Sequence, residues 1–212
     1  MVECGLRGEL GIPNLRSADR ITRGVIMEAL KLEDRYTYSD YCKWDDSERL
    51  ELIDGVPYAM SPAPSWRHQD VSVGFIYQLR SFLAGKPCKV FAAPFDVRLN
   101  ADAGDDTVVQ PDIVVICDRS KITGTGCVGA PDMAIEILSP STESRDTLVK
   151  FKLYMNAGVR EYWIVDPDKK TVAAHVLDSG RFYVSHYSET DTAPVHVLEG
   201  CDINLSEVFM DV

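Results

Sequence analysis

Two carboxylates lie in apolar runs that are otherwise typical of buried β-strands. Asp112 directly precedes the run Ile113–Ile116, and Glu136 lies inside the run Met133–Leu138. Burial of an ionised carboxylate is unfavourable unless a cation or hydrogen-bond donors accompany it. Apolar residues on both sides of Glu136 indicate a strand that is covered on both faces. A chain of this kind must therefore fold so that a compensating group reaches Glu136.

The spacing of apolar residues predicts a mixed α/β (α+β) architecture. Residues 66–83 show the three- and four-residue spacing of an amphipathic helix, and Gly158 ends a second helix over 144–157. Asp54-Gly55 predicts the turn of a hairpin. The predicted strands cover residues 50–53, 56–60, 88–92, 95–99, 112–117, 133–138, 160–165, 171–176 and 181–186. A short helix is expected after Thr37, and the Gly-rich residues 121–131 are expected to form a loop.

The length of 212 residues suits one domain with an arm. We expect a partly flexible N-terminal arm over 1–36 and a single domain over 37–212. No apolar run is long enough to span a membrane, and the first residues lack the pattern of a secretion signal, so we expect a cytoplasmic protein with no membrane partner. The six cysteines form no C-x-x-C pair and are expected to be reduced, with Cys88 and Cys117 as apolar core residues.

The net charge of −11 argues against broad, non-specific binding of nucleic acid, which depends on neutralising phosphates. The charge is unevenly distributed, however. Residues 65–90 contain four basic residues and one acidic residue, whereas residues 171–212 contain one basic residue and seven acidic residues. The charge balance therefore weakens the case for a DNA substrate without excluding it.

Two strand carboxylates followed by a lysine on a helix are a pattern that can hydrolyse phosphodiesters. Mg²⁺ prefers carboxylate, carbonyl and water oxygens, and it stabilises charge on a phosphate and activates a water. If the two strands pair, Asp112 and Glu136 converge at one sheet edge, with the carbonyl of Ile137 as a further ligand. Lys150 would then assist at the same phosphate.

The helix after Glu136 places Asp146, Lys150 and Tyr154 on one face, whereas Lys152 points about 200° away from Lys150. Simpler interpretations exist. Asp146 and Lys150 form an ordinary acid-before-base helix pair, and Asp112 has the position of a turn cap. The residues by themselves leave a metal site and an internal salt bridge as equal alternatives.

Residues 48–177 resemble the Uma family, a large bacterial family described as "putative restriction endonucleases" within the PD-(D/E)XK nuclease superfamily. The matching motifs occur in order along the chain. They are Glu51–Gly55, Ser61-Pro62 with Arg67–Gln69, Ala93–Val97, Gln110–Ile113, Gly129–Asp132, Glu136–Thr142 and Gly158–Pro167. The motifs are specific in combination, and the stretch that contains them covers about 130 of the 212 residues.

The resemblance implies a restriction-endonuclease-like fold, in which a mixed central sheet is flanked by helices and carries the acids on a central hairpin. The superfamily motif matches Pro111-Asp112 and Glu136, but Leu138 stands where the motif lysine would be. The family pattern displaces this lysine onto the next helix, which matches Lys150, with Lys152 as the alternative. Glu51 resembles an additional upstream acid. Its alternative is a surface position on an edge strand.

The first functional hypothesis is an endonuclease that hydrolyses DNA with Mg²⁺, for which Mn²⁺ would substitute. Asp112, Glu136, Ile137 and Glu51 would hold the metal, and Lys150 would assist. His68 is a secondary catalytic candidate that contacts phosphate or relays a proton. The alternative is a non-catalytic nucleic-acid or protein interaction module that retains the nuclease fold. The strand-rich region after residue 171 is a candidate homodimer contact, and DNA specificity is not predicted.

Overall fold

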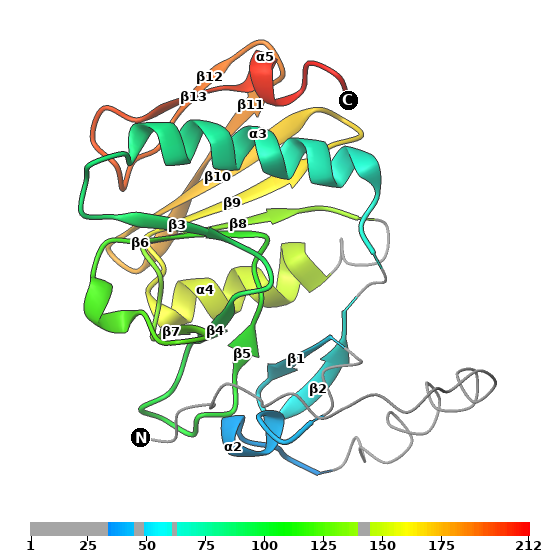
Figure 1. The fold of residues 1–212 in the computed structure, drawn as a ribbon, viewed down its shortest axis with the longest axis vertical. Coiled ribbons are helices and arrows are strands. Elements are labelled where there is room, and N and C mark those ends of the chain that lie inside the picture. The colour runs from blue at the N-terminus through cyan, green and yellow to red at the C-terminus, as the bar shows by residue number, and fades with distance from the viewer. Residues whose placement is uncertain (1–33, 45–48, 61–62, 140–144) are drawn as a thin grey trace, which may run out of the picture.

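The computed structural model describes residues 34–44, 49–60, 63–139 and 145–212 (Figure 1). The elements up to the middle of the chain are α2 (Tyr38–Tyr41), β1 (Leu50–Ile53), β2 (Val56–Ala59), α3 (Trp66–Phe82), β3 (Lys89–Ala92), β4 (Asp96–Arg98), β5 (Val108–Val109) and β6 (Ile113–Ile116). The later elements are η1 (Arg119–Lys121), β7 (Gly126–Val128), β8 (Met133–Ile137), the π-helix η2 (Arg145–Lys150), α4 (Phe151–Ala157), β9 (Glu161–Asp166), β10 (Thr171–Asp178), β11 (Arg181–Ser188), β12 (Thr192–Pro194), β13 (Asp202–Asn204) and α5 (Leu205–Val208).

Two mixed sheets form the framework. The larger sheet has the strand order β11-β10-β9-β8-β6-β3, and only its β8–β9 pair is parallel. The second sheet has the order β2-β1-β5-β4-β7 and includes one parallel pair, β4–β7. Strands β12 and β13 form a separate pair. The predicted mixed α/β architecture is confirmed.

Helices α3 and α4 lie on opposite sides of the larger sheet (Figure 1). Successive residues of a strand point to opposite faces, and β6 shows this directly. Ile113 and Val115 pack in the core cluster that contains the buried face of α3, whereas Val114 and Ile116 pack in the cluster that contains Tyr154 of α4. The central strands β6 and β8 are therefore buried on both faces, as the apolar run around Glu136 predicts.

Most predicted elements are confirmed with bounds shifted by one or two residues. The hairpin turn at Asp54 and Gly55 has positive φ at both residues, as a type I′ turn requires. Helix α3 begins after Ser65, whose hydroxyl accepts the N–H of His68 at 3.2 Å. Gly158 ends α4 in the left-handed conformation.

The loop expected over residues 121–131 is partly wrong, because β7 lies within it and pairs with β4. Gly126 explains how a glycine-rich segment forms this strand. A Cβ at this position would collide with the carbonyl of Asp96, so the close approach of β7 to β4 needs glycine. The short elements β5, β12, β13 and α5 were not predicted. Their runs are too short to show a period.

The expectation that Cys88 and Cys117 are reduced is wrong, because the structure joins them in a disulfide. The register of β3 and β6 pairs Lys89 with Ile116, which brings the two cysteines opposite each other. Sequence spacing did not reveal this pair, because 29 residues separate the cysteines and the sheet register decides their contact. Cys127 and Cys201 are free and buried.

Two further expectations concern the N-terminal arm and the absence of a membrane-spanning segment. The arm expected over 1–36 falls mainly on residues 1–33, which lie outside the described residues. Among the described helices, none is both long and apolar enough to cross a membrane. Tyr36 donates its N–H to the carbonyl of Gly55 at 2.9 Å, so residues just before α2 are tied to the hairpin turn.

We expect Phe75→Ala to lower the free energy of unfolding by about 3–5 kcal/mol. The Phe75 side chain is fully buried and meets Trp163 edge to face, with ring centroids 6.0 Å apart. Urea denaturation monitored by circular dichroism measures the change. Val73→Ala, on the exposed face of the same helix, is the matched control and should shift stability by less than about 0.5 kcal/mol. Equal effects of the two substitutions would contradict this packing.

Candidate active site

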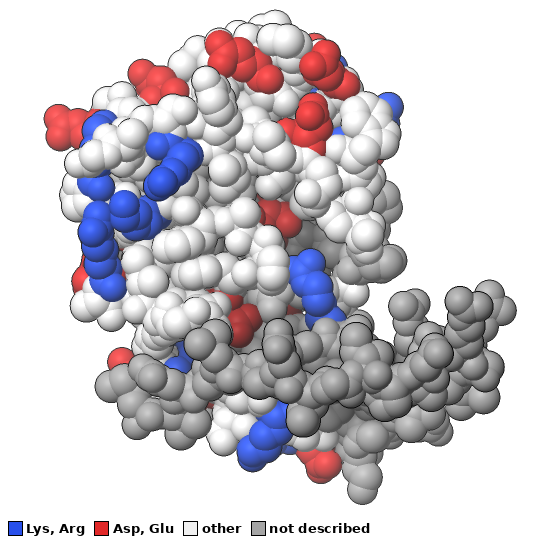
Figure 2. All heavy atoms as spheres, in the orientation of Figure 1, with Lys and Arg blue, Asp and Glu red and all other residues white. Residues whose placement is uncertain are grey.

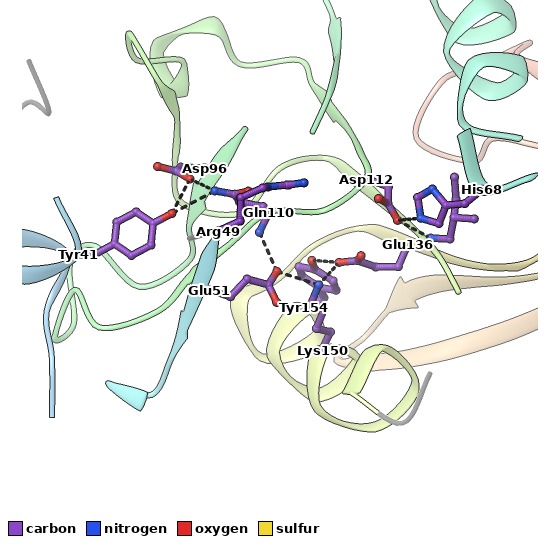
Figure 3. Close-up of polar contacts among 11 residues, drawn as sticks. Tyr41, Arg49, Glu51, His68, Asp96, Gln110, Asp112, Glu136, Lys150 and Tyr154 are labelled. Atoms are coloured by element: carbon purple, nitrogen blue, oxygen red, sulfur yellow. Dashed lines mark hydrogen bonds and ion pairs between the residues drawn. The ribbon is translucent and has the colours of Figure 1, made fainter. Parts of the chain in front are cut away.

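A buried lysine connects two glutamates that lie far apart in the sequence. The Nζ atom of Lys150, at the end of η2, lies 2.9 Å from Oε1 of Glu51 and 2.8 Å from Oε1 of Glu136. The exposed fraction is 1% for Glu51 and 3% for both Glu136 and Lys150. Figure 3 shows the three side chains pointing toward one another from β1, β8 and the helical segment. The compensating group that Glu136 requires is therefore Lys150.

Tyr154 completes this cluster one helical turn after Lys150. Its hydroxyl donates to Oε1 of Glu136 at 2.8 Å. Burial raises the pKa of Tyr154 well above its ordinary value, and the neighbouring Glu136 charge raises the pKa further. The phenol therefore stays protonated and acts as a hydrogen-bond donor. The expectation that Tyr154 is a core residue is confirmed, since its side chain is fully buried.

The position of Glu51 excludes its alternative as a surface residue on an edge strand. Strand β1 lies between β2 and β5 rather than at an edge. Oε1 of Glu51 accepts the backbone N–H of Gln110 at 2.9 Å in addition to the contact with Lys150. Glu51 is thus held by its ion pair with Lys150 and by the backbone N–H of Gln110, two residues before Asp112.

Asp112 lies across from Glu136 on paired strands. The antiparallel register of β6 and β8 pairs Ile113 with Ile135, so the next position pairs Asp112 with Glu136. Directly opposite residues share one face of a sheet, and like charges in such positions repel each other. The predicted convergence of the two acids at one end of these strands is therefore present in the backbone register.

Two donors hold the carboxylate of Asp112. Its Oδ2 accepts the backbone N–H of Ile137 at 2.8 Å and lies 3.3 Å from Nε2 of His68. The Asp112 side chain is 22% exposed, in contrast to the enclosed glutamates. His68 reaches this position from the first turn of α3 (Figure 3). The structure thus brings His68 and the backbone of Ile137 to the same carboxylate.

A second polar cluster, the Gln110 network, adjoins the first and was largely missed from the sequence. The amide nitrogen of Gln110 donates to Oδ1 of Asp96 at 2.9 Å and to the hydroxyl of Tyr41 at 3.1 Å, and its amide oxygen accepts from Arg49 at 2.9 Å. Burial, and next the charge of Asp96, raise the pKa of Tyr41. In the sequence, the motifs Gln110–Ile113 and Ala93–Val97 contained two members of this network, Gln110 and Asp96, but gave no sign that they contact each other.

The charges of the site favour a cation. Glu51, Glu136 and Asp112 supply three carboxylates against one lysine ammonium group, and carboxylate oxygens are the ligands that Mg²⁺ prefers. The donor set therefore fits Mg²⁺ chemically. Within the described residues, no group of three or more His, Cys, Asp or Glu side chains is arranged to hold a metal ion. In this arrangement Glu136 is turned toward Lys150 and Tyr154 rather than toward a shared metal position.

The remaining candidates are placed as follows. Lys152 is exposed, so the inward-facing lysine of this helical segment is Lys150. Ile137 contributes its N–H to Asp112. The side chain of Asp146 lies outside the described residues, so its predicted place on the face of Lys150 stays a prediction.

The fold is restriction-endonuclease-like, and it brings two strand acids and a buried lysine together. The structure of "a putative nuclease belonging to DUF820" from Anabaena variabilis superposes with a TM-score of 0.67. The match covers 82% of this chain and 98% of that chain at 19% sequence identity, so it supports the fold.

The family profile described as "Uma2: Putative restriction endonuclease" matches residues 37–206. The chain belongs to this family. A similar protein, "Uncharacterized protein slr1290" of Synechocystis sp., is 28% identical over 156 residues, which is 72% of this chain and 80% of that protein. The resemblance inferred from the motifs is therefore confirmed.

We expect Lys150→Met to lower the free energy of unfolding by about 3–5 kcal/mol, because it leaves two buried glutamates without their cation. Urea denaturation at neutral pH measures the loss. Lys152→Met is the matched control, since it removes an exposed lysine two residues away and should change stability by less than about 0.5 kcal/mol. A Lys150→Met protein as stable as the control would show that the ion pairs do not hold the site together.

Proposed function

We propose that this protein is a metal-dependent endonuclease that hydrolyses phosphodiester bonds in DNA. The observation that supports this function is the placement of Asp112 directly across from Glu136, with Lys150 in contact with Glu136. Membership of the family and the nuclease fold support the same reaction class. The site also opens to the surface, because Asp112 and His68 line a groove that a substrate can enter.

Asp112 and Glu136 would hold Mg²⁺, with the carbonyl of Ile137 and with Glu51 as further oxygen donors. When bound, the metal stabilises negative charge on the attacked phosphate and lowers the pKa of a water molecule. Mn²⁺ would bind the same oxygen donors. Accommodating the ion requires Glu136 to turn from the direction that it has in this structure, and its hydrogen bonds to Lys150 and Tyr154 identify the contacts that would change.

The residues of the chain have separate tasks in this reaction. Lys150 places a cation beside the carboxylates, where it offsets charge that develops on the phosphate and orients the attacking water. Tyr154 remains protonated and holds Glu136 by a hydrogen bond until Glu136 turns toward the metal. His68 orients Asp112 from the α3 side and is a side chain that can relay a proton.

We expect Asp112→Asn and Glu136→Gln each to reduce Mg²⁺-dependent cleavage of plasmid DNA by at least about a hundredfold, because each removes a charged metal ligand. Both substitutions preserve side-chain size, so circular dichroism should show a folded protein. Asp118→Asn is the matched control: it alters an exposed acid that caps η1 and should leave cleavage unchanged.

Calorimetry with Mn²⁺ separates the catalytic proposal from the interaction module. Binding by the wild-type protein that is lost in Asp112→Asn supports the metal site. A folded wild-type protein that binds neither Mg²⁺ nor Mn²⁺ at millimolar concentration and cuts no DNA would overturn the endonuclease proposal. That outcome would favour a module that retains the nuclease fold, with Lys150 as a permanent structural cation.

A further inference from the structure

A groove runs along α3 from the candidate active site to the start of β3. It has a volume of about 910 Å³, and its walls are α3 on one side and β3, the edge strand of the larger sheet, on the other. Asp112, His68 and Arg49 line one end, and Arg80 and Lys89 line the other. The twelve-residue separation between His68 and Arg80 corresponds to about 18 Å of helix. We call this feature the α3 groove.

The α3 groove is basic although the protein is acidic. Its lining includes the cations Arg49, Arg80 and Lys89, and Asp112 is its only acidic residue. Among the described residues, neither Arg80 nor Lys89 forms an ion pair. Figure 2 shows basic side chains gathered where α3 ends and β3 begins. Arg80 and Lys89 therefore offer an anion site at one end of the groove, and Arg49 offers a cation at the other end, in a chain whose net charge is −11.

An exposed aromatic residue lies beside these cations. Tyr77 lines the α3 groove and is 69% exposed, and it precedes Arg80 by three residues, so the two side chains are neighbours on the helix surface. Val73 and Ile76 add apolar lining. An aromatic face flanked by cations matches the two groups of a nucleotide, because the base stacks on the ring and the phosphate meets the cation.

The Gln110 network positions Arg49, the groove cation at the end where Asp112 lies. Arg49 donates to the amide oxygen of Gln110 at 2.9 Å, and Gln110 is fixed in turn by Asp96 and Tyr41. Gln110 also donates its backbone N–H to Glu51. Arg49 is therefore held in a fixed position relative to Glu51, and it lines the same groove as Asp112.

We infer that the α3 groove binds single-stranded DNA, with a base stacked on Tyr77 and phosphates at Arg80, Lys89 and Arg49. This inference rests on the proposed function and specifies the form of its substrate. In a duplex the base faces are stacked on one another, so Tyr77 would gain nothing from them, whereas a single strand exposes them. The strand leads from Lys89 to Asp112, where the phosphodiester would be cut.

Fluorescence anisotropy with a labelled oligothymidylate, in the presence of EDTA, tests binding by the full chain without cleavage. We expect the single strand to bind at least about tenfold more tightly than its duplex with oligoadenylate. Three phosphate contacts predict a slope of about −2 for the logarithm of the binding constant against the logarithm of salt concentration. Replacement of both Arg80 and Lys89 by Gln should make this slope less steep by about 1.4.

Three variants isolate the aromatic contact. Tyr77→Ala should weaken binding by at least about fivefold, and Tyr77→Phe should keep it within about twofold because the ring remains. Tyr183→Ala is the matched control, since Tyr183 is also exposed but lies on β11, at the other end of the larger sheet. It should bind as the wild-type protein does.

Equal or tighter binding of the duplex, or unchanged binding by Tyr77→Ala, would overturn the inference. It would also be overturned if neither DNA binds and sedimentation shows a dimer that Tyr77→Ala disrupts, because the groove would then contact a second copy of the chain. The binding experiment is independent of the cleavage experiment that tests the proposed endonuclease. Tyr77-dependent binding of the single strand without Mg²⁺-dependent cleavage would retain this inference and refute the endonuclease.

Discussion

The ammonium group of Lys150 joins the two sheets of this protein. Glu51 belongs to the smaller sheet and Glu136 to the larger one, and both accept the same cation in a site that excludes water. Each glutamate would be unfavourable in this environment without the lysine, so the contact constrains where the sheets and the helical segment meet. The same contact places an acid of the hairpin β1–β2 beside the acid of β8. The stability of the sheet junction and the chemistry of the candidate site therefore depend on one group.

Different faces of helix α3 contribute to the core, to the candidate site and to the α3 groove. Phe75 packs against Trp163 in the core, whereas Tyr77 and Arg80 face the groove. The first turn carries His68 to Asp112. A rigid helix packed on a sheet fixes these directions relative to one another, which is what a site needs when a substrate must approach two carboxylates from one side. The net negative charge of the chain does not describe this face, because the cations are concentrated where α3 meets β3.

The sequence predicted the elements with a strong local signal. Asp54-Gly55 predicted the hairpin, the apolar spacing predicted α3, and the acid in an apolar run predicted that Glu136 needs a partner. It failed where long-range pairing decides the outcome. Strand β7 forms from a glycine-rich segment because Gly126 allows close approach to β4, and Cys88 meets Cys117 only through the register of β3 and β6. No local period encodes such contacts.

By itself, the sequence determined the family, the mixed α/β class and the identity of Asp112, Glu136 and Lys150 as the residues to examine. These features depend on residue type and spacing, which the chain displays directly. Only the tertiary structure decided that Lys150 rather than Lys152 faces inward, that Glu51 is buried against it, and that Tyr154 donates to Glu136. It also created the Gln110 network and the α3 groove. The physical reason is that an ion pair or a groove exists only after separate strands and helices pack, and their register is a property of the whole fold.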